Sequence, residues 1–253
     1  MAKQLLIYSK AQAVSSQRHR NWTVKAGHTF EFARDVNSVP LTAVEIPPAA
    51  NEYPVVFAGE GDNIMPVAIM GMRDNENLYV NVEGQFEGKY VPAFLRRYPF
   101  VFSSTDAGDN FTLCIDEEFS GCAENGPGER LFDSEGEQTQ YLKNVLGFLK
   151  EYQLQFARTQ AFCRKLNELG LLESMGAEVS RGDGSKMTLT GFKAINHDKL
   201  KALPGDQLEA LAKTDGLELA YMHLFSLRHF TSMAARVPAP VKAETKTEEK
   251  AEA

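Results

Sequence analysis

The first half of the chain alternates short apolar runs with turn residues. Six runs rich in β-branched and aromatic side chains follow one another at intervals of roughly ten residues, which is typical of antiparallel sheets. Asp74-Asn75, Glu83-Gly84 and the segment 106–110 are the predicted turns between some of them. The predicted strands are 41–46, 53–57, 65–72, 77–82, 98–103 and 111–115. We therefore expect a bent antiparallel sheet within residues 1–120.

The second half carries the helical period. Apolar residues recur every three or four positions over 137–169, which predicts one long helix. Ser134 and Glu137 have the spacing of a capping box, and Gly170 is a plausible end. The runs 177–180 and 187–190 flank a Gly-Asp-Gly turn and predict a hairpin, and helices are expected at 205–214 and 217–235. The predicted fold class is α+β.

These elements predict a single domain over 1–236, β-rich in 1–120 and helix-rich in 121–236. The final segment, 237–253, contains alternating Ala, Lys and Glu behind a Pro-Ala-Pro break and has no aromatic residue. Such a composition buries too little apolar surface to offset the entropy of ordering, so we expect a disordered tail.

Composition and charge exclude several classes of protein. The 253 residues carry 27 Lys and Arg against 34 Asp and Glu, a net charge of −7, which argues against a nucleic-acid partner because phosphate binding needs a basic face. No run approaches the ~20 apolar residues of a membrane span, and the apolar start, Leu5 to Tyr8, is too short for a signal peptide. Three widely spaced cysteines suit a reducing compartment. We expect a cytoplasmic protein, with unconventional export to the cell surface left open.

Motifs for catalysis, cofactors and metals are missing from the sequence. It has no phosphate loop, no dinucleotide fingerprint, no nucleophile elbow and no paired C-x-x-C spacing. His223 and His229 are six residues apart and point to different faces of a helix, while His28 and His197 would need distant partners. Arg181-Gly182-Asp183 is read as a turn. We therefore expect no catalytic residue, no cofactor and no metal.

The most informative segment is 89–102. It sets Arg96 and Arg97 among the aromatic residues Tyr90, Phe94, Tyr98, Phe100 and Phe102. A buried guanidinium needs an acidic partner, and Glu45 and Asp116 are the candidates. One interpretation is a pocket for an anion or a peptide carboxylate, and the other, which we favour, is a buried ion pair that joins the sheet to the helices.

Several motifs resemble the bacterial SapC family, proteins of similar length named after a gene associated with surface-layer formation. The resemblance covers almost all of residues 1–235 and rests on combined motifs: the segments 40–47, 53–57, 71–79, 90–100, 114–116 and 130–133. It implies a link to the surface layer, and it assigns no catalytic residue and no cofactor to this chain.

The leading hypothesis is a non-catalytic accessory protein of the SapC type that recognises a protein, a peptide or a small anionic ligand. The first candidates for ligand binding are Arg96, Arg97, Tyr90, Tyr98, Glu45 and Asp116. A cytoplasmic enzyme acting on an amino acid or peptide, with Glu45, Asp116 or a histidine as acid–base group, is the first alternative. A structural surface-layer component is the second, and a homo-oligomer is also possible.

Overall fold

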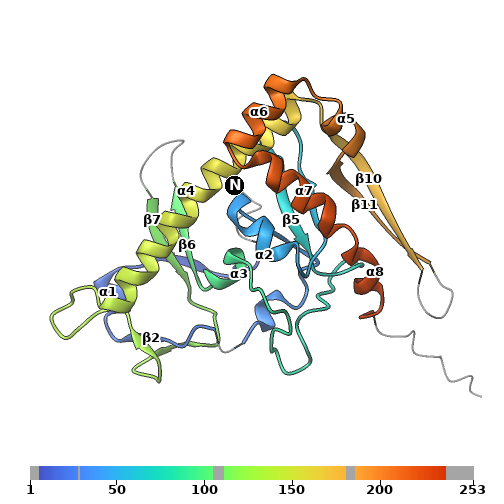
Figure 1. Ribbon diagram of the computed structural model, residues 1–253. Coiled ribbons are helices and arrows are strands. Elements are labelled where there is room, and N and C mark those ends of the chain that lie inside the picture. The colour runs from blue at the N-terminus through green and yellow to red at the C-terminus, as the bar shows by residue number, and fades with distance from the viewer. Residues whose placement is uncertain (1–5, 28, 105–110, 181–185, 238–253) are drawn as a thin grey trace, which may run out of the picture.

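The computed structural model shows an α+β protein in which antiparallel sheets are joined by one long helix (Figure 1). It describes residues 6–27, 29–104, 111–180 and 186–237. The predicted fold class is confirmed: strands dominate the first half, and the long helix, the hairpin and the C-terminal helices follow. The predicted turn at 106–110, the centre of the hairpin, His28 and nearly all of the tail lie outside the described residues.

Two three-stranded sheets lie toward one end of the long helix. The first has the order β1–β7–β6 and places both Gln12 and Phe100 opposite Ile115. The second has the order β8–β2–β9 and is built from shorter strands. Their bounds are β1 Ala11–Ala13, β6 Phe100–Ser104, β7 Phe111–Asp116, β2 Trp22–Val24, β8 Cys122–Glu124 and β9 Glu129–Arg130.

The third sheet has five strands in the order β10–β11–β4–β5–β3. The outer hairpin is long, whereas β11 meets β4 through a single register pair, Lys193 opposite Phe57. The sheet is therefore weakly joined at its centre, and this junction is where a helix packs. Its strands are β3 Ser38–Pro40, β4 Val55–Ala58, β5 Met65–Ile69, β10 Leu172–Ser180 and β11 Lys186–Ile195.

Helix α4, Gln140–Glu168, crosses the molecule and contacts elements from all three sheets (Figure 1). Thr139 caps its first turn by accepting a hydrogen bond from the Leu142 amide, so the predicted Ser134 cap is wrong by five positions. The helix ends as predicted, with Gly170 in the left-handed region at φ +65°.

Two predicted strands and one predicted helix boundary are wrong. Residues 41–46 form a 3₁₀ turn and a short helix because the Thr42–Glu45 capping box and the following prolines favour a helix start. Residues 77–82 form a loop in which only Val80 bridges to Phe86. The predicted helix 217–235 is two helices, α7 and α8.

The remaining helical elements are short. Near the N-terminus and around the sheets they are α1 Ser16–His19, η2 Glu31–Ala33, η3 Ala43–Glu45, α2 Ile46–Ala49, η4 Gly61–Asn63 and α3 Ala93–Arg96. The C-terminal helices are α5 His197–Lys201, α6 Gly205–Lys213, α7 Gly216–Ser226 and α8 His229–Ala234. A large core lies among the sheets and α4, and a smaller core lies under α5, α6 and α7.

One buried hydroxyl fixes α4 to η3. Thr159 Oγ1 accepts a hydrogen bond from the Ala43 amide at 2.7 Å and donates to Gln155 O at 2.6 Å, and its side chain is fully buried. This contact joins positions 116 residues apart and holds the turn that presents Glu45.

We expect Thr159→Val to lower the free energy of unfolding by about 1–3 kcal/mol, because the Ala43 amide would lose its acceptor while buried. Thr159→Ser is the matched control, since it keeps the hydroxyl and should cost about 1 kcal/mol or less. Urea unfolding of both variants measures the difference. Equal losses would show that the methyl group, and not the hydrogen bond, stabilises this junction.

Candidate functional site

The six residues singled out from the sequence gather around α3, where the β1–β7–β6 sheet meets α4. Glu45 is 4% exposed and accepts four hydrogen bonds. Its Oε2 accepts from the Thr42 amide and hydroxyl, both at 2.8 Å, and its Oε1 accepts from Tyr90 at 2.9 Å and from the Ala93 amide at 2.6 Å. Glu45 thus ties η3 to α3.

Asp116 is a second buried carboxylate, at the end of β7. Its Oδ1 accepts from the Lys10 and Glu118 amides at 3.0 and 3.2 Å, and its Oδ2 accepts from the Ser9 amide at 2.8 Å and from Tyr98 at 3.2 Å. The hydrogen bonds to both acids come from amides and hydroxyls, which stabilise a buried carboxylate as a cationic partner would.

Arg97 lies inside a cage of aromatic rings. Its side chain is buried, and its guanidinium carbon is 4.4 Å from the centre of the Phe94 ring, 5.0 Å from that of Tyr152 and 5.8 Å from that of Tyr8. Burial raises the pKa of Tyr152, Arg97 lowers it, and Glu45 raises it further, so the cation and the acid act on the same phenol. Because Tyr152 is on α4, the cage holds this helix against α3.

Arg96 has a different environment from its neighbour. It is exposed, donates from Nε to Val91 O at 3.0 Å, and lies 5.5 Å from the centre of the Phe148 ring. Of the aromatic residues predicted to frame the arginines, Phe94 contacts Arg97, while the other two rings of the cage, Tyr152 and Tyr8, come from outside the segment 89–102. Tyr90, which is half-buried, donates its hydroxyl to Glu45 Oε1.

We expect Arg97→Met to lower the free energy of unfolding by about 2–4 kcal/mol, because it removes a buried cation that contacts three rings. Arg96→Met is the control and should change stability by about 0.5 kcal/mol or less, as is usual for an exposed site. Thermal and urea unfolding of both variants test this expectation, which similar losses would contradict.

A charged cluster around Glu117 is not visible in the sequence. This side chain is 6% exposed and receives two hydrogen bonds from Arg18, while Lys10 Nζ lies 3.4 Å away. The hydrogen bonds and positive charges of Arg18 and Lys10 together lower the pKa of Glu117 to about 2, with the Arg18 hydrogen bond as the main cause. His19 Nε2 is 3.3 Å from Glu117, but burial lowers the pKa of this histidine. The partners are about 100 positions from Glu117, so no local spacing indicates the cluster.

The arrangement of side chains on α7 is inverted for a surface helix. Its buried residues are small or polar: Gly216, Ala220, His223 and Ser226. Its most exposed residues include two aromatic ones, Tyr221 at 44% and Phe225 at 46%. A surface helix normally turns its large apolar side chains to the core, so the outer face of α7 has the composition of a covered surface.

His223 explains the polar inner stripe of α7. In the ladder that pairs Lys193 with Phe57, Ile195 and Val55 would be the next partners. Instead the imidazole stands between them: Nε2 accepts from the Ile195 amide at 3.1 Å, and Nδ1 is 2.7 Å from Val55 O. Since the amide can only donate and the carbonyl can only accept, the ring is neutral and carries its proton on Nδ1.

Ser226 completes this attachment one turn later. Its hydroxyl accepts from the Val55 amide at 2.9 Å and donates to His223 O at 2.6 Å. The backbone amide and the backbone carbonyl of Val55 are thereby both hydrogen-bonded to side chains of α7. The helix consequently takes the place of a β11–β4 ladder where the strands separate.

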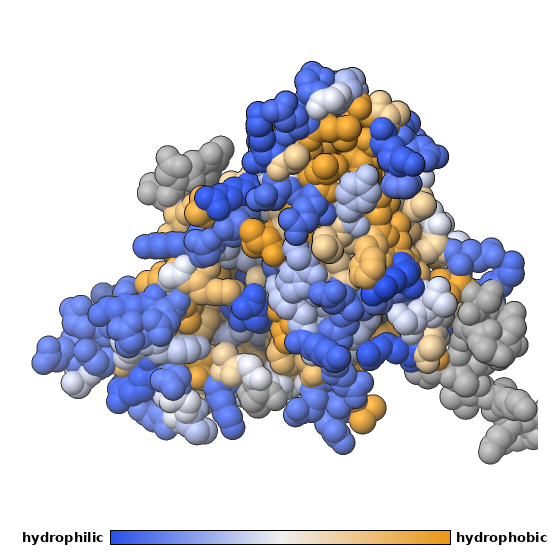
Figure 2. Space-filling view, in the orientation of Figure 1, coloured by the Kyte–Doolittle hydropathy of each residue, from blue (hydrophilic) through white to orange (hydrophobic). Residues whose placement is uncertain are grey.

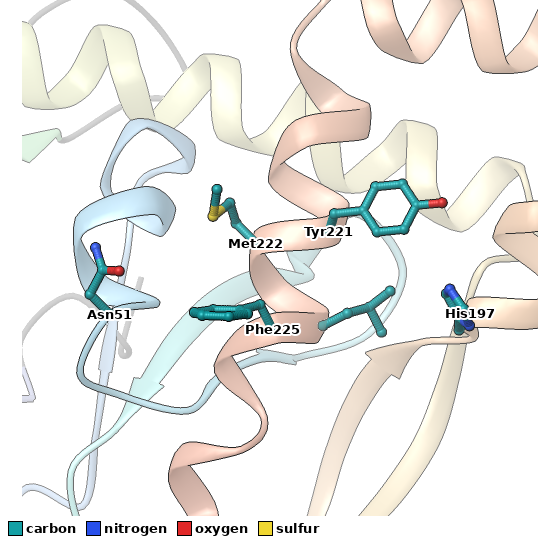
Figure 3. A pocket seen from close by; sticks show the side chains of 6 residues that line it. Asn51, His197, Tyr221, Met222 and Phe225 are labelled. Atoms are coloured by element: carbon teal, nitrogen blue, oxygen red, sulfur yellow. The ribbon is translucent and has the colours of Figure 1, made fainter.

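An open hollow of about 640 Å³ lies over the outer side of α7. Figure 3 shows Met222 and Phe225 on the side of the helix that faces Asn51, and Tyr221 on the side that faces His197. Leu224 completes the lining. In the space-filling view, hydrophobic residues gather between α5, α6 and α7 (Figure 2). This surface is open and mostly apolar.

Burial lowers the pKa of His223 to about 4, and this gives the protein a distinct pH dependence. The unfolded chain binds this proton below about pH 6.5, but the folded chain binds it only below about pH 4. The contribution of neutral His223 to the free energy of unfolding is therefore fully present above pH 6.5. It falls by about 3 kcal/mol as the pH drops from 6.5 to 4.

We expect His223→Gln to remove this component, because the amide can donate to Val55 O and accept from the Ile195 amide without titrating. His223→Leu should be about 2–4 kcal/mol less stable than the wild type near neutral pH, since it leaves two buried backbone groups unpaired. This difference should shrink toward pH 4, because the wild type loses its own contribution there. Urea unfolding between about pH 4 and 7.5 distinguishes the three proteins. An unchanged pH slope in His223→Gln would refute the bridging role.

Metal ligation and membrane crossing find no support in the described residues. No group of three or more His, Cys, Asp or Glu side chains there has the arrangement of a metal site. No helix in the same part of the chain is long and apolar enough to cross a membrane.

The comparisons with known proteins give one match. The SapC family model matches residues 14–233, which include the six residues gathered around α3 and the whole of α7. Neither the curated proteins nor the solved structures contain a match to this chain.

Proposed function

The chain belongs to the SapC family, and from this premise we propose that it is a non-catalytic accessory protein that binds another protein or a peptide through the outer face of α7. This face consists of Glu218, Tyr221 and Phe225 of α7 and of Arg228 just beyond its end, flanked by Met222 and Leu224. The association with surface-layer formation rests on the family resemblance and is part of the proposal.

The single observation that carries the proposal is the inverted arrangement of α7. Tyr221 and Phe225 each leave more than two fifths of their surface exposed, while His223 and Ser226 are fully buried beneath them. Aromatic residues of this kind are enriched at protein interfaces, where they supply most of the binding energy. A protein or peptide that covers them would remove this apolar surface from water.

The shape of the hollow favours a protein or peptide over a small molecule. Small-molecule sites are concave and enclose most of their ligand. The hollow over α7 is open, and its lining lies on both sides of the helix (Figure 3). Of the two arginines named as first candidates for binding a small anion, Arg97 has its side chain enclosed by Phe94, Tyr152 and Tyr8.

The state of the buried polar groups supports a non-catalytic role. Glu45, Asp116 and His223 are the groups that an acid–base mechanism would use. Each directs its hydrogen bonds to backbone groups and neighbouring hydroxyls that hold two elements together. These contacts give each group a structural function.

A photo-crosslinker tests the proposal in the native cell. We expect p-benzoylphenylalanine in place of Tyr221 to give a covalent adduct of protein mass under ultraviolet light. The same group in place of Val82, an apolar residue that is 89% exposed in a loop, should give none. Phe225→Asp should abolish the adduct formed from position 221.

A folded chain that forms no protein adduct from position 221 would contradict the proposed function. Equal adducts from positions 221 and 82 would also contradict it, because they would reflect exposure alone. Circular dichroism and the melting temperature of each variant show whether the chain remains folded.

A further inference from the structure

The outermost residues of α7 form one stripe with an unusual order. Glu218, Tyr221, Phe225 and Arg228 are all exposed and are spaced three, four and three residues apart, which keeps them on one face of a helix. Leu227 and Arg228 keep right-handed helical backbone angles beyond the end of α7, so Arg228 continues the stripe. The guanidinium of Arg228 lies 3.6 Å from the centre of the Phe225 ring.

This stripe is symmetric about its centre. Glu218 and Arg228 lie five residues before and after position 223, and Tyr221 and Phe225 lie two residues before and after the same position. An acid at one end thus corresponds to a base at the other, with two aromatic residues between them. When a second copy of this stripe is turned antiparallel, it places Glu218 opposite Arg228 twice and Tyr221 opposite Phe225 twice.

We propose that the partner of the α7 outer face is a second copy of this chain. The two α7 helices lie antiparallel, and the two-fold axis crosses their outer faces at the level of position 223, midway between Tyr221 and Phe225. This inference rests on the proposed function and names the partner for the same surface. Two-fold dimers require one patch to be complementary to itself, and this stripe meets that condition in both charge and apolar character.

The surroundings of the two charged residues support this partner. Within the described part of the chain, neither Glu218 nor Arg228 has an opposite charge within 4 Å, although several other exposed acids do. The antiparallel arrangement also places opposite ends of the two helix dipoles side by side. Figure 3 shows side chains directed to both sides of α7, so the helix of one copy can lie beside the lining residues of the other.

Charge reversal provides a test with an internal control. We expect the wild-type mass measured by sedimentation to rise with concentration toward twice 28.1 kDa. Arg228→Glu places four acids at the interface and Glu218→Arg places four bases there. Each variant alone should therefore dimerise at least about tenfold more weakly, because like charges in an interface are strongly unfavourable.

The decisive sample is the equimolar mixture of the two variants. In a mixed dimer, Glu218 of the Arg228→Glu chain lies opposite Arg228 of the Glu218→Arg chain. The two substituted side chains lie opposite each other and form a second pair of opposite charge. We expect this mixture to recover the affinity of the wild type, whereas neither variant does so alone. Lys150→Glu, an exposed change of the same charge on α4, should have no effect.

A wild-type chain that stays at 28.1 kDa up to about 100 μM would overturn the dimer. A mixture that remains as monomeric as its separate variants would overturn it as well. The crosslinking experiment separates these failures from that of the proposed function. If position 221 still forms an adduct with a different protein, the surface is a binding site and only the identity of its partner is wrong.

Discussion

The contact on which the structure depends most is the imidazole of His223, placed between Ile195 and Val55. The strands β11 and β4 share one register pair and then separate, and the ring carries the hydrogen bonding across the gap. A buried backbone amide and carbonyl need partners, so whatever fills this gap must be polar and of the right length. The residue comes from α7, and this sets the orientation of the whole helix.

The orientation of α7 follows from this requirement. His223 and Ser226 are directed at Val55, and the other buried residues of α7 are the small Gly216 and Ala220. A side chain at position 216 would meet Leu211 of α6 and Phe162 of α4. The larger apolar side chains beside this stripe pack only in part against the two cores; they are Leu217, Leu219, Met222 and Leu224. Tyr221 and Phe225 face outward as a consequence of how the sheet is completed, and the outer face becomes available for binding.

Arg97 performs a comparable structural role where α3 packs against α4. There α4 must pack against α3 and the β1–β7–β6 sheet, and the guanidinium does this by contact with rings from three different segments. Glu45 and Asp116 each fix a neighbouring turn through backbone amides. The residues that suggested a ligand site in the sequence thus also form the junction between the first half of the chain and α4.

Much of the fold could be predicted because its signals are local. The period of α4 and the stop at Gly170 depend on residues within a few positions of one another. Residues 41–46 were predicted as a strand because of their β-branched composition, although the Thr42–Glu45 spacing and the following prolines are equally local signals of a helix start.

The candidate site was harder to predict because its contacts join residues that are far apart in the sequence. The aromatic frame of 89–102 is local and was visible, but whether Arg96 or Arg97 is enclosed depends on Tyr152, more than fifty positions away. The outer face of α7 could not be found from the helical pattern, because an inverted stripe has the same period as an ordinary one. Only the position of the sheet shows which side of that helix is buried.

The protonation state of His223 is the most direct test of this account. Nuclear magnetic resonance of the imidazole nitrogens should show a neutral ring with its proton on Nδ1, a titration near pH 4, and a hydrogen-bond coupling between Nε2 and the Ile195 amide. A proton on Nε2 at neutral pH, or a titration near about pH 6.5, would mean that His223 does not bridge the strands. The inward polar stripe of α7, and with it the reason for its apolar outer face, would then lose its physical basis.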